Sequence, residues 1–109
     1  MSLTYLASPY THPDPVVRMH RYWAAVEACA RLMKDGEMVF APIPFCHEVA
    51  LIIGNPCDGE FWTKQLVPYL EIMTKLKVLR LDGWEQSKGV AHEIGVAQSK
   101  NIPVEYIDP

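Results

Sequence analysis

The sequence has little that suggests a membrane or a nucleic-acid partner. No apolar run approaches the roughly 20 residues that cross a bilayer, and the first residues lack the basic and apolar regions of a signal peptide. The net charge is −3, and the basic residues are scattered rather than clustered. We therefore expect a cytoplasmic protein that binds neither membranes nor nucleic acid.

Cysteine is also scarce. Cys29, Cys46 and Cys57 are odd in number and form no C-x-x-C pair, which indicates reduced thiols rather than a disulfide framework. The Cys-His-Glu triplet at residues 46–48 and the other histidines have no spacing typical of a zinc site. The sequence therefore predicts no metal and no other cofactor.

No repeat, linker or low-complexity segment interrupts the chain, and we expect a single domain over residues 1–109. Short apolar segments alternate with helical patterns, which predicts an α/β fold. Asp14 and Pro15 are typical of a helix start, and Gly36 is typical of a helix end. The expected strands cover residues 4–7, 38–41, 77–81 and 104–107, and the expected helices cover residues 16–35, 45–53, 59–75 and 87–100.

Two of these helices allow finer predictions. Asp58 should cap the helix over residues 59–75, and Pro68 within it should produce a kink or a break near residues 66–67. The first helix carries an apolar stripe that should face the core. The members of this stripe are Val16, Met19, Trp23, Val26, Ala30 and Met33.

The order of these elements predicts how the strands pair. Strand, helix and strand within residues 4–41 form a right-handed βαβ unit, so the first two strands are parallel neighbours. A helical connection and a second βαβ unit follow. The expected fold is a three-layer sandwich with a four-stranded parallel sheet of order 2-1-3-4 and helices on both faces. Its switch point lies between the first and third strands, where open α/β sheets bind ligands.

Two loops should lead into the crevice at that switch point. The loop after the first strand holds Ser8, Pro9 and Tyr10, and the loop after the third strand holds residues 82–87. We interpret Tyr10 as a phenol that faces a ligand, and we expect His47 in a wall of the crevice. In the second loop Gly83 precedes Trp84, whose indole either stacks on a base or, as we favour, packs against a neighbouring subunit.

Glu93 is the candidate of greatest interest. It lies six residues after Ser87, in the second turn of its helix, and borders a stripe formed by Val90, Ile94 and Ala97 that should be buried. A carboxylate there is either half-desolvated and directed to the crevice, or exposed and stabilised by the helix dipole. The sequence leaves both interpretations open.

The start of the same helix suggests an anion site. Ser87, Lys88 and Gly89 offer a hydroxyl, an ammonium group and accessible amides, although a plain N-cap serine explains the pattern equally simply. Asp82 is either a turn residue or a second carboxylate near Glu93. Two carboxylates that flank a glycosidic bond are the equipment for N- or O-glycoside cleavage.

These motifs have a family resemblance. TYLASPY (residues 4–10) resembles the opening strand and loop of the nucleoside 2-deoxyribosyltransferase-like superfamily, and DGWEQSKGVAHE (residues 82–93) resembles its later motif. Over nearly its whole length the chain resembles small bacterial and phage proteins of the DUF1937 family within that superfamily. The resemblance implies a flavodoxin-like fold and an oligomer, often a dimer, with sites near subunit contacts.

The resemblance also implies roles for individual residues. Glu93 matches the nucleophile that attacks the anomeric carbon of deoxyribose, and Tyr5 matches the tyrosine that orients it. Residues 87–89 are similar to the segment that holds the sugar 5′ group or its phosphate. The active relatives carry an aspartate that interacts with the base, but the matching stretch here, residues 62–67, contains no carboxylate.

The leading hypothesis is an N-glycosidase or deoxyribosyltransferase that acts on a nucleoside or nucleotide and forms a homo-oligomer, either a dimer or a tetramer. Glu93 attacks C1′ or directs water to it, Tyr5 or Tyr10 orients Glu93, and Asp82 assists the leaving base. One alternative is a non-catalytic nucleotide-binding or sensing module of the same fold. Another is an interaction protein that oligomerises through the apolar residues 49–53.

Overall fold

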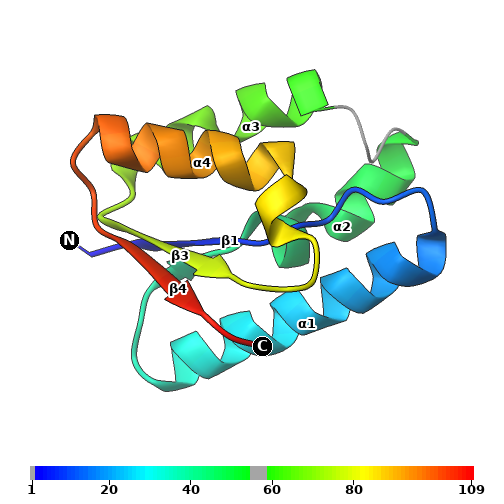
Figure 1. Cartoon of the computed structure of the whole chain (residues 1–109), viewed down its shortest axis with the longest axis horizontal. Coiled ribbons are helices and arrows are strands. Elements are labelled where there is room, and N and C mark those ends of the chain that lie inside the picture. The colour runs from blue at the N-terminus through cyan, green and yellow to red at the C-terminus, as the bar shows by residue number, and fades with distance from the viewer. Residues whose placement is uncertain (1, 55–58) are drawn as a thin grey trace.

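The sheet has the predicted topology. The computed structural model describes residues 2–54 and 59–109. The four strands β1 (Thr4–Ala7), β2 (Val39–Phe40), β3 (Lys75–Leu79) and β4 (Val104–Ile107) pair in parallel in the order β2-β1-β3-β4 (Figure 1). The predicted order 2-1-3-4 is confirmed, and the carboxyl ends of β1 and β3 are neighbours at the switch point.

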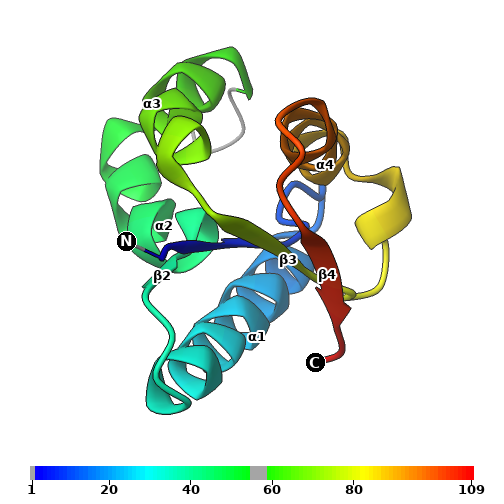
Figure 2. The ribbon, with the colours of Figure 1, turned by 90° about the vertical axis from the view of Figure 1, so that its left-hand side faces the viewer.

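Helices cover both faces of this sheet, as predicted (Figure 2). α1 (Pro15–Lys34) packs on one face, and α3 (Gly59–Ile72) and α4 (Lys88–Ser99) lie on the other. α2 (Pro42–Ile53) packs against α1, and a short 3-10 turn, η1 (Trp84–Gln86), leads into α4. Within the described ranges, no helix is long and apolar enough to cross a membrane.

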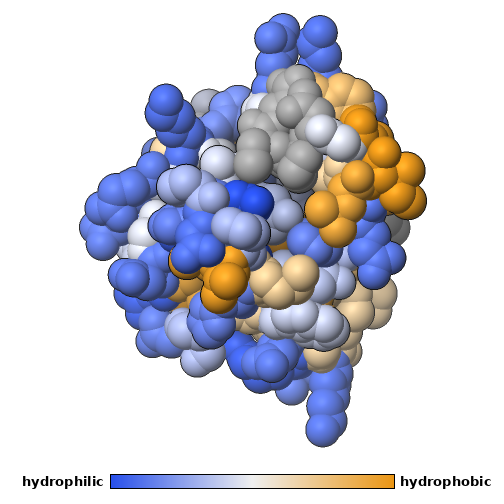
Figure 3. Space-filling view, turned by 90° about the vertical axis from the view of Figure 1, so that its right-hand side faces the viewer, coloured by the Kyte–Doolittle hydropathy of each residue, from blue (hydrophilic) through white to orange (hydrophobic). Residues whose placement is uncertain are grey.

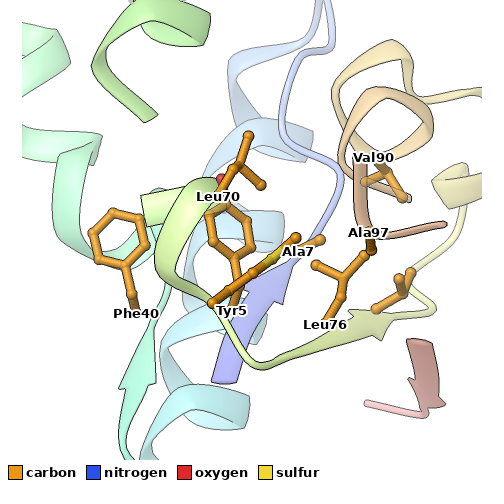
Figure 4. Close-up of a cluster of buried hydrophobic side chains, with 9 residues drawn as sticks. Tyr5, Ala7, Phe40, Leu70, Leu76, Val90 and Ala97 are labelled. Carbon is orange, nitrogen blue, oxygen red and sulfur yellow. The ribbon is translucent and has the colours of Figure 1, made fainter. Parts of the chain in front are cut away.

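The alternation of side chains along the strands produces two cores. Tyr5 rises from β1 toward Leu70 of α3 and packs with Phe40 and Leu76 (Figure 4). The next residue, Leu6, faces the opposite side, where it packs with buried residues of α1 such as Leu32. Strands that are apolar on both faces are typical of parallel sheets covered on both sides.

The predicted helix ends are confirmed where short-range chemistry determines them. The Asp14 carboxylate accepts a hydrogen bond from the Val16 amide at 2.9 Å, and Pro15 is the first residue of α1. Gly36 follows α1 with φ of 96°, a left-handed conformation that glycine adopts without steric cost. Ser87 caps α4 through a hydrogen bond from the Val90 amide to its hydroxyl oxygen.

The predicted buried stripe of α1 is wrong. Val16, Met19, Trp23 and Met33 are 74, 45, 55 and 46% exposed. The side of α1 that faces the sheet is instead formed by Ala25, Ala28, Cys29 and Leu32. Small side chains allow this helix to lie close to the strands. The periodic pattern alone did not distinguish this face from the larger apolar residues on the other side.

Several predicted boundaries are also wrong. α2 begins at Pro42 rather than residue 45, since a proline at the first helical position loses no hydrogen bond. β3 covers Lys75–Leu79 rather than residues 77–81, because the amides of Thr74 and Lys75 already donate to the Leu3 carbonyl. α3 ends at Ile72 and continues through Pro68 without a break. The predicted cap Asp58 and the thiol of Cys57 lie outside the described residues.

Candidate functional site

A cavity of about 730 Å³ lies at the carboxyl ends of β1 and β3. Residues that follow β1, together with Gly83 and residues 86–89, form part of its wall, and residues of α2, α3 and α4 form most of the rest. Figure 3 shows this end of the molecule, where the surface is largely hydrophilic and apolar side chains gather at one margin. The volume is typical of sites for small molecules.

Glu93 lies in the wall of this cavity. It comes from the second turn of α4, and it is only 8% exposed, which excludes the interpretation as a surface glutamate. Because burial disfavours the charged form, the pKa of Glu93 rises from 4.5 to about 7. A carboxyl group with this pKa changes its charge near neutral pH, which is suitable for acid–base or nucleophilic chemistry.

The structure brings Tyr5 and Glu93 into contact. The fully buried Tyr5 hydroxyl donates a hydrogen bond to Glu93 Oε2, and this bond partly opposes the effect of burial on the Glu93 pKa. Burial and the neighbouring negative charge of Glu93 raise the pKa of Tyr5 far above its ordinary value, so the phenol stays protonated and donates. The pair joins residues that are 88 positions apart in the chain.

The amino end of α4 forms a second part of the cavity wall. Ser87, Lys88 and Gly89 all line the cavity, so the positive end of the helix dipole faces it. Ser87 caps the helix through its hydroxyl oxygen and is also one of the residues that line the cavity. This arrangement is suitable for an anionic group of a ligand.

Arg21 joins the two loops at the mouth of the cavity. Its Nη1 donates to the carbonyl oxygen of Thr11 at 3.0 Å, and its Nη2 donates to the carbonyl oxygen of Asp82 at 3.0 Å. Arg21 also lines the cavity. Its guanidinium group therefore fixes the loops after β1 and β3 relative to each other and adds a positive charge beside the α4 terminus.

His47 forms an aromatic cluster with Tyr10 and Tyr22 on the α2 side of the cavity. The His47 ring is buried, its Nδ1 lies 2.8 Å from the Tyr10 hydroxyl oxygen, and it stacks on Tyr22 with ring centroids 4.0 Å apart. Two further polar atoms of cavity residues, Ser8 Oγ and Trp62 Nε1, are buried without a hydrogen-bond partner in the described part of the chain. Such atoms are rare in folded proteins, and a ligand is one way to satisfy them.

The two motifs at residues 4–10 and 82–93 thus contribute residues to one cavity. A family match covers both motifs. The DUF1937 family, described as a domain of unknown function, matches residues 2–108. The chain belongs to the DUF1937 family. The match extends from β1 to β4 and so includes all the described elements that line the cavity. No curated protein matches the chain.

Most of the site residues predicted for this DUF1937 protein do line the cavity. These are Ser8, Tyr10, His47, Gly83, Ser87, Lys88, Gly89 and Glu93. Four predicted residues are not among the lining residues. Tyr5 is fully buried and reaches the site only through its hydrogen bond to Glu93, and Pro9 is also fully buried. Asp82 is exposed, and Trp84 packs against Tyr106. The role of Asp82 as an acid therefore stays a prediction without geometric support.

Other residues of the DUF1937 site were missed by the sequence analysis. Arg21 has no local signal, because its partners lie 10 and 61 positions away. Trp62 and Cys46 lie in stretches that the sequence analysis considered for other reasons. Trp62 belongs to the helix expected over residues 59–75, and Cys46 belongs to the Cys-His-Glu triplet that was considered as a metal site. In the described residues, no group of three or more His, Cys, Asp or Glu side chains is arranged to hold a metal ion.

The Tyr5–Glu93 hydrogen bond predicts a measurable effect on titration. Tyr5→Phe removes the bond that lowers the Glu93 pKa, so we expect this pKa to rise further above 7, by about one pH unit. Carbon-detected NMR of labelled glutamate carboxyl groups measures the shift directly. Tyr106→Phe removes the hydroxyl of a tyrosine that packs against Trp84 and does not line the cavity, so it is the control. A Glu93 pKa that is equal in both variants contradicts the prediction.

Gly83 predicts a destabilising substitution. Its φ is 89°, and a Cβ there would lie 2.6 Å from Arg21 Nη2. We expect Gly83→Ala to lower the free energy of unfolding by about 1–3 kcal/mol, since the backbone becomes strained and Arg21 must move. Gly95→Ala is the matched control, because it lies within α4 with open space and should stabilise by up to about 1 kcal/mol. Denaturant unfolding that shows similar effects for both variants would refute this account.

Proposed function

We propose that this DUF1937 protein is a nucleoside or nucleotide N-glycosidase or 2-deoxyribosyltransferase, a member of the nucleoside 2-deoxyribosyltransferase-like superfamily that its motifs resemble. One observation carries the proposal. A buried glutamate with a pKa of about 7, hydrogen-bonded to a buried tyrosine, lines a cavity of nucleoside size. Such a carboxyl group has no evident structural role, because ionisation of a buried acid costs stability.

The proposed reaction uses the ionised form of Glu93. Its carboxylate attacks C1′, the bond between C1′ and the base nitrogen breaks, and the electron pair leaves with the base. Water or a second base then attacks C1′ and releases the carboxylate, so the configuration is retained. Tyr5 holds the attacking oxygen in place through its hydrogen bond.

The opposite end of the ligand has an anchor in this proposal. Ser87, the amides of α4 and the Lys88 ammonium group hold the sugar 5′ hydroxyl or a 5′-phosphate, and Arg21 adds positive charge nearby. A sugar phosphate that reacts at C1′ requires positive charge for its phosphate and a carboxyl group near C1′. The cavity has both, at the start of α4 and at Glu93. A preference for the 5′-monophosphate over the free nucleoside is therefore part of the proposal.

Product analysis tests this function. The wild-type protein is incubated with a panel of deoxynucleosides and ribonucleosides and their 5′-monophosphates, and released base is quantified by chromatography. We expect release from at least one compound by wild type and none by Glu93→Gln. No release from any compound, or equal release by both proteins, contradicts the proposal.

A non-catalytic nucleotide-binding module is the second candidate. It is favoured by one observation: among the described lining residues Glu93 is the only carboxylate, so no second acid stands beside it. Calorimetric binding of a nucleoside monophosphate without turnover distinguishes this candidate from the enzyme. Loss of binding in Ser87→Ala together with unchanged binding in Glu93→Gln would support it.

We further propose that the protein forms a homo-oligomer through α2. Ile52 is 87% exposed, and Phe45, Val49, Leu51 and Ile53 are each about half exposed. Figure 3 shows apolar side chains gathered at one margin of this end of the molecule. Patches of this kind often mark contacts between proteins. We expect light scattering to give a dimer or tetramer for wild type and a monomer for Ile52→Glu, while a monomeric wild type contradicts the proposal.

A further inference from the structure

The proposed reaction leaves one proton without a donor. A purine or pyrimidine base leaves slowly as an anion, so enzymes that cleave such bonds benefit from a group that protonates it. Glu93 is occupied as the nucleophile, and no other carboxylate lines the described part of the cavity. Three histidines remain as candidate donors: His12, His47 and His92.

The surroundings of these histidines distinguish them. His12 holds its own loop, because its Nδ1 accepts a hydrogen bond from the Asp14 amide at 3.0 Å. His92 is exposed on α4. His47 is only 7% exposed and comes from α2, in the wall of the same cavity. Of the three, His47 alone is both buried and held by aromatic side chains in the described structure.

The contacts of His47 fix its ring and leave one nitrogen available. Its Nδ1 lies 2.8 Å from the Tyr10 hydroxyl oxygen, and its ring stacks on Tyr22 with an angle of 23° between the planes. No hydrogen bond to Nε2 occurs in the described residues. Because His47 lines the cavity and its Nδ1 is engaged by Tyr10, Nε2 is the ring nitrogen left for a ligand, since the hydrogen bond at one nitrogen of a histidine determines the role of the other.

His47 also lies in the neighbourhood of the Tyr5–Glu93 pair. The residue before it, Cys46, lines the same cavity and is close enough to Tyr5 that a thiolate there would raise the Tyr5 pKa. The start of α2 thus adjoins the group that contacts Glu93. A ligand whose C1′ lies at Glu93 therefore has His47 within the same cavity.

We propose that His47 is the general acid that protonates the leaving base, an inference that rests on the proposed function. The imidazolium donates its Nε2 proton to a ring nitrogen of the base while the bond between C1′ and the base breaks and the bond from Glu93 to C1′ forms. Nδ1–H donates to the Tyr10 oxygen throughout. The neutral imidazole then takes a proton from the water or the second base that attacks C1′, and Glu93 leaves as a carboxylate.

The test compares leaving groups that differ in their need for a proton. His47→Asn keeps a donor near the position of Nδ1 but removes Nε2. The two substrates are the fastest nucleoside of the panel and the 4-nitrophenyl glycoside of the same sugar, whose nitrophenolate leaves without protonation. We expect kcat/KM for His47→Asn to fall about 10²–10⁴-fold with the nucleoside and less than about tenfold with the nitrophenyl glycoside.

Two controls complete the experiment. His20→Asn changes an exposed histidine of α1 that does not line the cavity, and it should leave both rates unchanged. For His47→Ala, added imidazole should restore base release from the nucleoside, which a purely structural role of His47 would not allow.

Each outcome decides a different point. Equal losses with both substrates, together with no rescue by imidazole, would show that His47 only supports the structure and would overturn the inference. No loss with the nucleoside overturns it as well. A wild-type protein that releases no base from any compound overturns the proposed function first, and the acid role of His47 with it.

Discussion

Glu93→Gln is expected to reduce base release by at least about 10³-fold, because the amide cannot attack C1′ as a carboxylate does. The substitution keeps the size of the side chain and leaves a hydrogen-bond partner for the Tyr5 hydroxyl. Steady-state release of base from the best nucleoside measures the effect. Glu85→Gln changes an exposed glutamate of η1 in the same segment, outside the cavity lining, and should retain wild-type rates.

The same substitution should stabilise the fold at alkaline pH. Glu93 has a pKa of about 7 in the folded protein against 4.5 as the reference value for the unfolded chain. Below pH 4.5 both states hold the proton, and the glutamate costs nothing relative to glutamine. As pH rises, the unfolded chain ionises first, so wild type loses stability between these two pKa values and reaches a loss of about 3 kcal/mol above pH 7.

Denaturant unfolding at a series of pH values checks this sign. The difference in the free energy of unfolding between Glu93→Gln and wild type should be near zero at pH 4.5 and grow to a gain of about 3 kcal/mol at pH 8. Glu85→Gln should show no such trend. A variant that is less stable than wild type at pH 8 would mean that the carboxylate is held by favourable contacts, and the assignment of burial as the dominant effect would be wrong.

Glu37→Gln should have the opposite effect on stability. Lys77, a residue of β3 that is 9% exposed, donates to Glu37 Oε2 at 2.6 Å, and the Thr4 hydroxyl donates to Oε1 at 2.8 Å. Removal of the charge leaves the Lys77 ammonium group poorly paired within the protein, although Glu105 lies 3.9 Å away. We expect a loss of about 2 kcal/mol in the free energy of unfolding at pH 7.

The pH dependence of this ion pair follows from the Glu37 pKa. The hydrogen bond from Lys77 lowers that pKa below its ordinary value, so the contribution of Glu37 is present at neutral pH and is lost as pH falls through the lowered pKa. Lys75→Gln breaks an exposed pair with Glu105 and is the matched control, with an expected cost below about 1 kcal/mol. Equal costs for the two variants at pH 7 would contradict the importance of burial here.

Much of this architecture is predictable from short stretches of sequence. Asp14 with Pro15, Gly36, and Ser87 mark helix ends through contacts within a few residues, and those predictions are confirmed. The apolar strands and the helices between them also imply the sheet order, because right-handed crossover connections leave few arrangements. The position of Glu93 beside a buried helical stripe followed from the same local periodicity.

Other features depended on contacts between distant parts of the chain. A helix with apolar residues on two sides does not reveal which side the sheet covers, and α1 turned its alanines inward and left Trp23 outside. Arg21 donates a hydrogen bond to the carbonyl oxygen of Asp82, and nothing in the sequence near either residue predicts a contact across 61 positions. The predicted partner of Glu93, Asp82, proved to be exposed, while His47 and Tyr10 met on the α2 side of the cavity.

Local sequence patterns placed Glu93 in the second turn of a helix capped by Ser87, and the family resemblance of the two end motifs is what linked Tyr5 to Glu93. The folded arrangement was required to show that Glu93 is a buried acid with a pKa of about 7 rather than an ordinary surface charge. Desolvation depends on everything that packs around a carboxylate, and for Glu93 this includes Tyr5, a residue 88 positions away in the chain.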